Sequence, residues 1–244
     1  MKIIEKIKAK QKDLSNNSAI TIAFIGDSVT QGCFECYTTS DTAIDTVFDY
    51  KSAFSTRVKE ILNILYPNVQ FNIINAGVSG DRAASGYKRL ERDVIAFNPD
   101  VCVVSYGLND SCCSVSVDEY AKSLENIFLS LKNKDIETVF LTQNCMNTKT
   151  SCHLTDELLK KMADKFSIIQ NDGTFKKYME AAKRVSKNYG VKICDLYSIW
   201  ERLISLDVDV TELLANKLNH PIREFHYYIA IKLVETILYD NDLY

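Results

Sequence analysis

The sequence lacks any long hydrophobic run. None of its apolar segments approaches the roughly 18 residues that a membrane-spanning helix needs, although 46% of the 244 residues are hydrophobic. The first residues, MKIIEKIKAKQKDLSNNS, carry lysines throughout and contain no apolar core of the kind that a secretory signal has. We therefore expect a cytoplasmic protein without a membrane partner.

An excess of positive charge is also absent. The formal net charge is −3 at pH 7, so we expect no polybasic surface for nucleic acid. The chain has no G-x-G-x-x-G segment and no P-loop, which argues against a flavodoxin-like nucleotide or flavin protein. We therefore predict no cofactor and no nucleic-acid partner, and the sequence does not indicate an oligomeric state.

No internal repeat, low-complexity segment or linker divides the chain. Its 244 residues suit one α/β domain with a substantial core and are few for two domains. We interpret residues 1–244 as a single domain. A short amphipathic helix over about residues 1–14 is expected to pack on it, because Ile3, Ile4 and Ile7 lie at helical spacing.

Apolar runs that favour strands alternate with segments of helical periodicity. Strands are indicated at 20–26, 69–75, 100–106, 137–142 and 191–195. This alternation predicts an α/β fold: a single-domain, doubly wound, flavodoxin-like sheet of five parallel strands in the order 2-1-3-4-5, with helices on both faces. Residues 33–49 interrupt the pattern, and we expect a long loop with a short helical piece there.

Polar turns follow the first three predicted strands. They are GDS at 26–28, SGD at 79–81 and GLND at 107–110, and NHP at 219–221 stands before the last helical segment. Because parallel strands end at one edge of a sheet, we expect the first three turns to converge there. A serine, a histidine and amide donors at one rim fill the roles of nucleophile, general base and oxyanion hole. Each turn alone is also compatible with an ordinary loop or helix cap.

These four blocks, in this order, resemble those of the SGNH (GDSL) hydrolases. The matching positions lie within residues 20–230 and so span most of the chain. The resemblance implies that Ser28 attacks an ester carbonyl and that His220 accepts the proton. The backbone N–H groups of Ser28 and Gly80 and the side-chain amide of Asn109 would form the oxyanion hole.

The neighbouring polar residues of these blocks are predicted to support the site. Asp110 is expected to brace its loop rather than take part in the chemistry. The other supporting residues are Asp27, Asn216 and Asn219.

One position departs from the family's pattern. An acid commonly stands three residues before the family's histidine, but Lys217 stands there in this chain. Losing the acid of a triad can cost about 10⁴ in rate, or about 5.5 kcal/mol, because the imidazole loses its correct tautomer and orientation. One interpretation, which we favour, is that a backbone carbonyl or Asn216 accepts the Nδ1–H of His220.

Two other interpretations remain open. A carboxylate from elsewhere can replace the missing acid, or the chain can be a catalytically impaired binding protein that kept the fold. The candidate carboxylates are Asp209, Glu212 and Glu224.

The remaining histidines and the eight cysteines have simpler interpretations. His226 is expected on the surface or in packing, and His153 can border the pocket without any motif that requires it. Cys33-x-x-Cys36 and Cys112-Cys113 follow neighbouring strands, so zinc and a redox-sensitive disulfide are alternatives. Adjacent cysteines, however, chelate zinc poorly. We expect free thiols, the default in a reducing cytosol, and no metal.

The resemblance fixes the reaction class and leaves the acyl group open. The sequence shows no obvious lid and no long apolar segment of the kind that suits a lipase at a lipid interface. We therefore expect a small-molecule or carbohydrate ester with a small acyl group, acetyl first.

Overall fold

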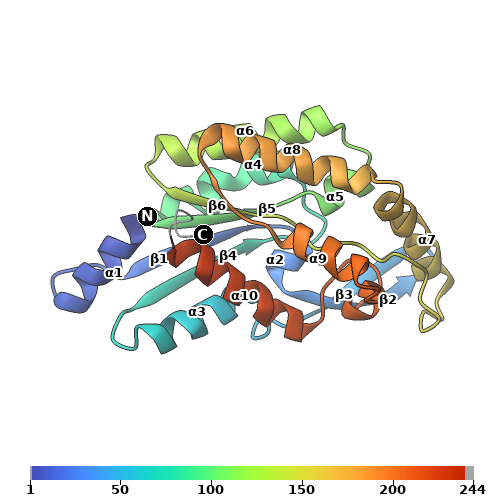
Figure 1. Cartoon of the computed structure of the whole chain (residues 1–244), viewed down its shortest axis with the longest axis horizontal. Coiled ribbons are helices and arrows are strands. Elements are labelled where there is room, and N and C mark those ends of the chain that lie inside the picture. Colours follow the sequence, from blue (N-terminus) through green and yellow to red (C-terminus); the bar gives the residue numbers. More distant parts are fainter. Residues whose placement is uncertain (1, 240–244) are drawn as a thin grey trace.

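The computed structural model describes residues 2–239. The other residues of the predicted domain, 1 and 240–244, lie outside the described range. Its centre is one parallel sheet (Figure 1). The strands are β1 (Ile20–Gly26), β4 (Phe71–Gly77), β5 (Val101–Ser105), β6 (Glu137–Leu141) and β7 (Lys192–Cys194). Their order is β4-β1-β5-β6-β7, and every neighbouring pair is parallel. Counted along the chain within this sheet, the order is 2-1-3-4-5, which confirms the predicted fold class.

Helices cover both faces of the sheet (Figure 1). The lower face in that view carries α3 (Phe54–Leu65) and α10 (Arg223–Leu238), which pack on each other. The upper face carries α4 (Ala83–Asp93), α6 (Val117–Asn133) and α8 (Thr174–Tyr189), with α6 in contact with both others. The remaining helices are α1 (Lys2–Lys12), α2 (Ser28–Gln31), α5 (Leu108–Cys112), α7 (Glu157–Asn171) and α9 (Leu196–Ser205), with 3₁₀ turns η1 (Ile95–Phe97) and η2 (Val210–Leu213).

The core lies between the sheet and these two helical layers. β5 is buried at every position, and β1 at all but one, because both are central strands with helices on each face. The helix α1 buries Ile3 and Ile7 and contacts β1 and α10. No helix within residues 2–239 is long and apolar enough to cross a membrane.

The predicted loop over residues 33–49 is wrong. This segment forms an antiparallel hairpin of β2 (Cys33–Ser40) and β3 (Ala43–Phe48), which is separate from the central sheet. Its threonines and its aromatic and β-branched residues favour strands. The hairpin is exposed along most of its length, so no alternation of apolar and polar residues reveals it.

Candidate active site

The ends of three strands lie at the same level of the sheet. Gly26, the last residue of β1, pairs with Gly77 of β4 on one side and with Ser105 of β5 on the other. Each of these residues ends its strand, so the turns that follow start from one edge. This register produces the convergence expected from the sequence.

The four residues central to the predicted site line one cavity of about 210 Å³. Ser28 begins α2 directly after β1, Gly80 lies in the turn after β4, and Asn109 lies in α5 after β5. His220 comes from the segment before α10 and is buried. Residues that are far apart in the sequence therefore face one space.

Ser28 and His220 form a hydrogen-bonded pair. The distance between Ser28 Oγ and His220 Nε2 is 2.9 Å. On the other side of the ring, Nδ1 lies 2.9 Å from the backbone carbonyl oxygen of Phe34. A carbonyl oxygen only accepts hydrogen bonds, so this contact requires the proton on Nδ1 and leaves the lone pair of Nε2 facing the serine hydroxyl.

Asn216 fixes the segment that carries the histidine. Its Oδ1 accepts hydrogen bonds from the backbone N–H groups of Leu218, Asn219 and His220, at 3.0, 2.9 and 2.9 Å. Its Nδ2 donates to Asn219 Oδ1 at 3.0 Å. Asn216 therefore organises the loop, while the Nδ1 proton goes to the Phe34 carbonyl and not to the Asn216 side chain.

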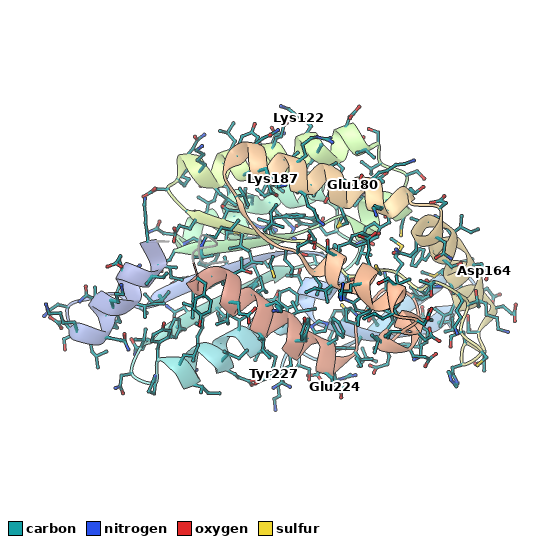
Figure 2. All side chains as sticks on the ribbon, viewed as in Figure 1. Lys122, Asp164, Glu180, Lys187, Glu224 and Tyr227 are labelled. Atoms are coloured by element: carbon teal, nitrogen blue, oxygen red, sulfur yellow. The ribbon has the colours of Figure 1, made fainter. Side chains whose placement is uncertain are left out.

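None of the candidate carboxylates takes the place of the missing acid. Lys217 has a left-handed backbone, φ 57°, and its ammonium group pairs with Glu212 at 2.8 Å. Asp209 pairs with a lysine at 2.6 Å. Glu224 lies on the outer edge of α10 (Figure 2) and is exposed. The partner of His220 Nδ1 is instead a backbone atom.

Burial determines the charge state of the histidine. It lowers the pKa of His220 to about 4, while the Phe34 carbonyl and the negative charge of Glu35 act in the opposite direction. The imidazole is therefore neutral near pH 7 and has a free lone pair on Nε2. A general base needs this form.

The predicted oxyanion donors border the same cavity. Gly80 has φ +77° and lines the cavity, and among residues 2–239 nothing lies within 4 Å of the position that a Cβ would take. Asn109 Nδ2 donates one hydrogen bond to the Asp81 carbonyl oxygen at 3.0 Å, which leaves its second N–H. The N–H of Ser28 is at the first position of α2, where helical N–H groups have no partner within the helix.

Two buried carboxyl groups support these turns. Asp27 caps α2 by accepting a hydrogen bond from the Val29 N–H at 3.0 Å, and it accepts another from Gln143 Nε2 at 3.0 Å. Asp110 accepts the Ala83 N–H at 3.2 Å and so connects α5 to the start of α4. Burial raises the pKa of Asp27 to about 7 and that of Asp110 to about 6.

Arg89 and the wall of the cavity belong to no sequence motif. Arg89 pairs with the buried Asp81 at 2.8 Å and donates to the carbonyl oxygens of Gly26 and Ala76, and so it connects β1 to β4. The side walls come from β3 and α7, and no motif pointed to them. The wall residues of these two elements are Ile44, Asp45, Thr46, Phe48, Met162 and Phe166.

The eight cysteines are all free thiols, and one of them borders the site. Cys36 lines the cavity, with its Sγ 4.0 Å from His220 Nδ1. Cys112 contacts Met146. Within residues 2–239, no group of three or more histidine, cysteine, aspartate or glutamate residues is arranged to hold a metal ion.

The other two histidines do not line the cavity. His226 is buried, with its ring beside that of Phe34, and its Nδ1 accepts a hydrogen bond from the Phe54 N–H at 3.2 Å. His226 is thus a packing residue. His153 is exposed in the segment between β6 and α7.

Comparisons with known proteins agree with this geometry. Residues 24–226 match the GDSL-like lipase/acylhydrolase family. An acetylxylan esterase of Geobacillus stearothermophilus is 27% identical over 121 residues, which cover 46% of this chain and 53% of that protein. The alignment thus spans about half the length of that curated relative.

Two solved structures share the fold. A GDSL-like lipase from Parabacteroides merdae superposes with a TM-score of 0.70 at 19% identity, covering 91% of this chain and 97% of that one. A catalytic mutant of an acetylxylan esterase from Geobacillus stearothermophilus gives 0.68 at 19% identity, covering 91% and 96%. Since the family match covers most of the sequence, this chain belongs to the GDSL-like lipase/acylhydrolase family.

Proposed function

We propose that this protein is a serine esterase that removes a small acyl group, acetyl first, from a carbohydrate or another polar alcohol. The observation that carries the proposal is the hydrogen-bonded series from the Phe34 carbonyl through His220 to Ser28 at the wall of a cavity. This series holds a hydroxyl beside a neutral base, which is the arrangement that activates a serine nucleophile.

The reaction then follows in two halves. Ser28 Oγ attacks the ester carbonyl carbon as its proton passes to His220 Nε2. The N–H groups of Ser28 and Gly80 and the amide of Asn109 hold the negative oxygen of the tetrahedral intermediate. The intermediate collapses when the C–O bond to the alcohol breaks and His220 returns the proton to the departing oxygen. An acyl-enzyme remains on Ser28.

Water completes the cycle by the same route. His220 takes a proton from water as the water oxygen attacks the acyl carbon. The second intermediate collapses by breaking the bond to Ser28 Oγ, and the serine regains its proton from His220 Nε2. The products are the carboxylic acid and the free enzyme.

The size of the cavity supports a small acyl group. Its volume of about 210 Å³ lies below the roughly 300–1,000 Å³ of pockets that hold drug-sized ligands. A relative and a structural neighbour are named as acetylxylan esterases, and another neighbour as an esterase active on acetylated mannans. These names support a carbohydrate acetyl ester as the substrate class.

The main argument for a non-catalytic binding protein was Lys217. The histidine has an acceptor for its Nδ1 proton without an acid at that position. The departure from the family's pattern therefore no longer favours a loss of catalysis.

The acyl preference is tested with p-nitrophenyl acetate, butyrate and octanoate. We expect kcat/KM to be highest for acetate, and we expect release of acetate from acetylated xylooligosaccharides. A higher kcat/KM for octanoate than for acetate would contradict the proposed preference for a small acyl group.

The nucleophile is tested in the same assay with Ser28→Ala. Removing the serine of a comparable triad costs about 10⁶ in kcat, so we expect hydrolysis at the background rate. Ser186→Ala is the matched control, because Ser186 is buried in α8 and its hydroxyl has no hydrogen-bond partner among residues 2–239. Undiminished hydrolysis by Ser28→Ala would contradict the mechanism.

A further inference from the structure

The carbonyl that orients the histidine lies in an irregular part of the β2–β3 hairpin. Residues 33–36 of β2 pair with residues 46–48 of β3, so β2 contains one extra residue in this interval. Such a bulge disrupts the ladder locally and redirects backbone groups. Phe34 lies inside the bulge, and its carbonyl oxygen lies 2.9 Å from His220 Nδ1.

Arg223 connects this hairpin to the segment that carries the histidine. It is the first residue of α10, three positions after His220. Its Nη1 and Nη2 donate to the two carboxylate oxygens of Glu35 at 2.6 and 3.0 Å, and its Nε donates to Asp49 at 3.0 Å. Its guanidinium carbon lies 4.3 Å from the centre of the Phe34 ring.

One carboxylate stands on β2 and the other directly after β3, at the base of the hairpin. Glu35 belongs to β2 and immediately follows Phe34, while Asp49 immediately follows β3. Two further contacts close the base: Asp49 N–H donates to the Gly32 carbonyl at 2.9 Å, and Thr46 Oγ1 donates to the Glu35 carbonyl at 2.9 Å. One guanidinium therefore holds both strands at the level of the carbonyl.

We propose that Arg223, through its contacts with Glu35, Asp49 and the Phe34 ring, is a positioning residue that holds the Phe34 carbonyl against His220. This inference rests on the proposed function. We call the contacts of Arg223 with Glu35 and Asp49 the clamp, because they join the hairpin to α10. The clamp orients the histidine indirectly, as the acid of a catalytic triad does directly in other enzymes. A bidentate arginine–carboxylate pair suits this task, because it fixes direction as well as distance.

Solvent limits what the clamp adds to stability. The side chains of Arg223 and Glu35 are 34% and 45% exposed, so water screens this ion pair and reduces its contribution to the free energy of unfolding. The reaction rate is more sensitive than stability to such contacts, because a displacement of about 1 Å at a reacting group can lower the rate about 10²-fold. Breaking the clamp is therefore expected to affect turnover more than folding.

The test compares Arg223→Gln, Glu35→Gln and the double variant with the wild type on p-nitrophenyl acetate. We expect each single variant to lower kcat about 10- to 100-fold, with KM and the melting temperature nearly unchanged. The double variant should be no slower than the worse single variant, because both break one clamp. Arg223→Lys should not restore kcat, because an ammonium group cannot form the bidentate pair.

A spectroscopic measurement reports on the orientation directly. With ¹⁵N-labelled histidine, the wild type should show a slowly exchanging proton on His220 Nδ1. In both single variants we expect that proton to exchange faster. A purely structural role for Arg223 would leave this signal unchanged in the folded variants.

Arg57→Gln is the matched control. Arg57 pairs with Glu60 at 2.8 Å within α3, and the side chains are 30% and 47% exposed. We expect wild-type kcat. If Arg223→Gln does not fold, Glu35→Gln still decides the question, because Glu35 is partly exposed and lies on the outer hairpin.

The outcomes distinguish this inference from the proposed function. A wild type that hydrolyses no ester contradicts the proposed function. An active wild type whose folded Arg223→Gln and Glu35→Gln variants keep kcat within about twofold, well short of the expected loss, contradicts the clamp alone.

Discussion

At the scale of single residues, the main finding is that His220 is oriented by a carbonyl oxygen and not by a carboxylate. The Phe34 carbonyl 2.9 Å from Nδ1 fixes the same tautomer that an acid would fix. It carries no full negative charge, so it stabilises an imidazolium less than a carboxylate does. The site therefore keeps the orientation that a triad supplies and gives up part of its electrostatic support.

The charge state of His220 leads to a prediction about pH. Because burial lowers its pKa to about 4, the imidazole loses its free lone pair only as the pH falls through about 4. We expect kcat/KM for p-nitrophenyl acetate to stay level from neutral pH down to about pH 5 and then fall. An acidic limb near the ordinary histidine pKa of about 6.5 would contradict this environment. Recovery of activity at pH 7 controls for unfolding.

The residues of the candidate site belong to sequence motifs, whereas the backbone partner of the histidine does not. Ser28, Gly80, Asn109 and His220 stand in recognisable blocks, and they line one cavity. The carbonyl of Phe34 belongs to no motif, because every residue has a carbonyl and only the folded chain shows where it points. The sequence could therefore predict that a backbone carbonyl accepts the Nδ1 proton, but not which residue supplies it.

At the scale of elements, the position of α2 depends on a glycine in β4, Gly77, which has no side chain. A Cβ added to Gly77 would lie 2.2 Å from the backbone nitrogen of Gln31, the last residue of α2. Backbone atoms cannot move aside as the end of a flexible side chain can. The close approach of β4 and α2 therefore requires glycine and places Ser28 at the rim.

Gly77→Ala should displace α2 and the serine at its start. We expect a lower melting temperature and a kcat per folded molecule reduced by roughly 10-fold or more. Gly190→Ala is the control, because Gly190 lies at the end of α8 with φ +69°, and no described residue comes within 4 Å of its Cβ position. It should lose about 1 kcal/mol of stability to backbone strain and keep its kcat. Equal kcat in both variants would contradict the close-packing account.

The β2–β3 hairpin was not predicted from the sequence, and its exposure explains why. The strands of the central sheet are buried runs, and their hydrophobicity reveals them. The strands β2 and β3 are exposed over most of their length, so burial leaves no pattern in their sequence. Their bulge and the cavity wall they form were therefore not predictable, although the hairpin supplies the histidine's partner.

At the scale of the whole molecule, the order of strands follows from the alternation of apolar runs and helical segments. Right-handed crossovers leave few other topologies for such a chain, and the register at Gly26 aligns the turns. What the alternation does not fix is the position of segments outside the sheet. The hairpin, the loop that Asn216 organises and the ion pairs of Arg223 depend on tertiary contacts.

The buried groups of the site also make folding stability depend on pH. The pKa of Asp27 is raised to about 7, whereas an unfolded aspartate titrates near about 3.9. As the pH rises from about 4 to about 7, the unfolded chain releases this proton and the folded chain keeps it, so stability falls. His220 acts in the opposite sense, because its lowered pKa removes stability as the pH falls below about 6.5.

Asp27→Asn isolates the first of these contributions. The variant cannot ionise and keeps an oxygen that can accept the Val29 N–H. We expect the unfolding free energy of the variant, relative to the wild type, to rise between about pH 4 and about pH 7. Urea unfolding at several pH values measures this difference. A difference that does not change with pH would show that the pKa of Asp27 is not raised in the folded protein.

The most direct test of the central claim is labelling with a fluorophosphonate, followed by intact-mass measurement near neutral pH. We expect one adduct on the wild type, carried by Ser28, and none on Ser28→Ala. An unlabelled wild type, or a Ser28→Ala variant labelled as fast as the wild type, would contradict the claim that His220 and the Phe34 carbonyl activate this serine.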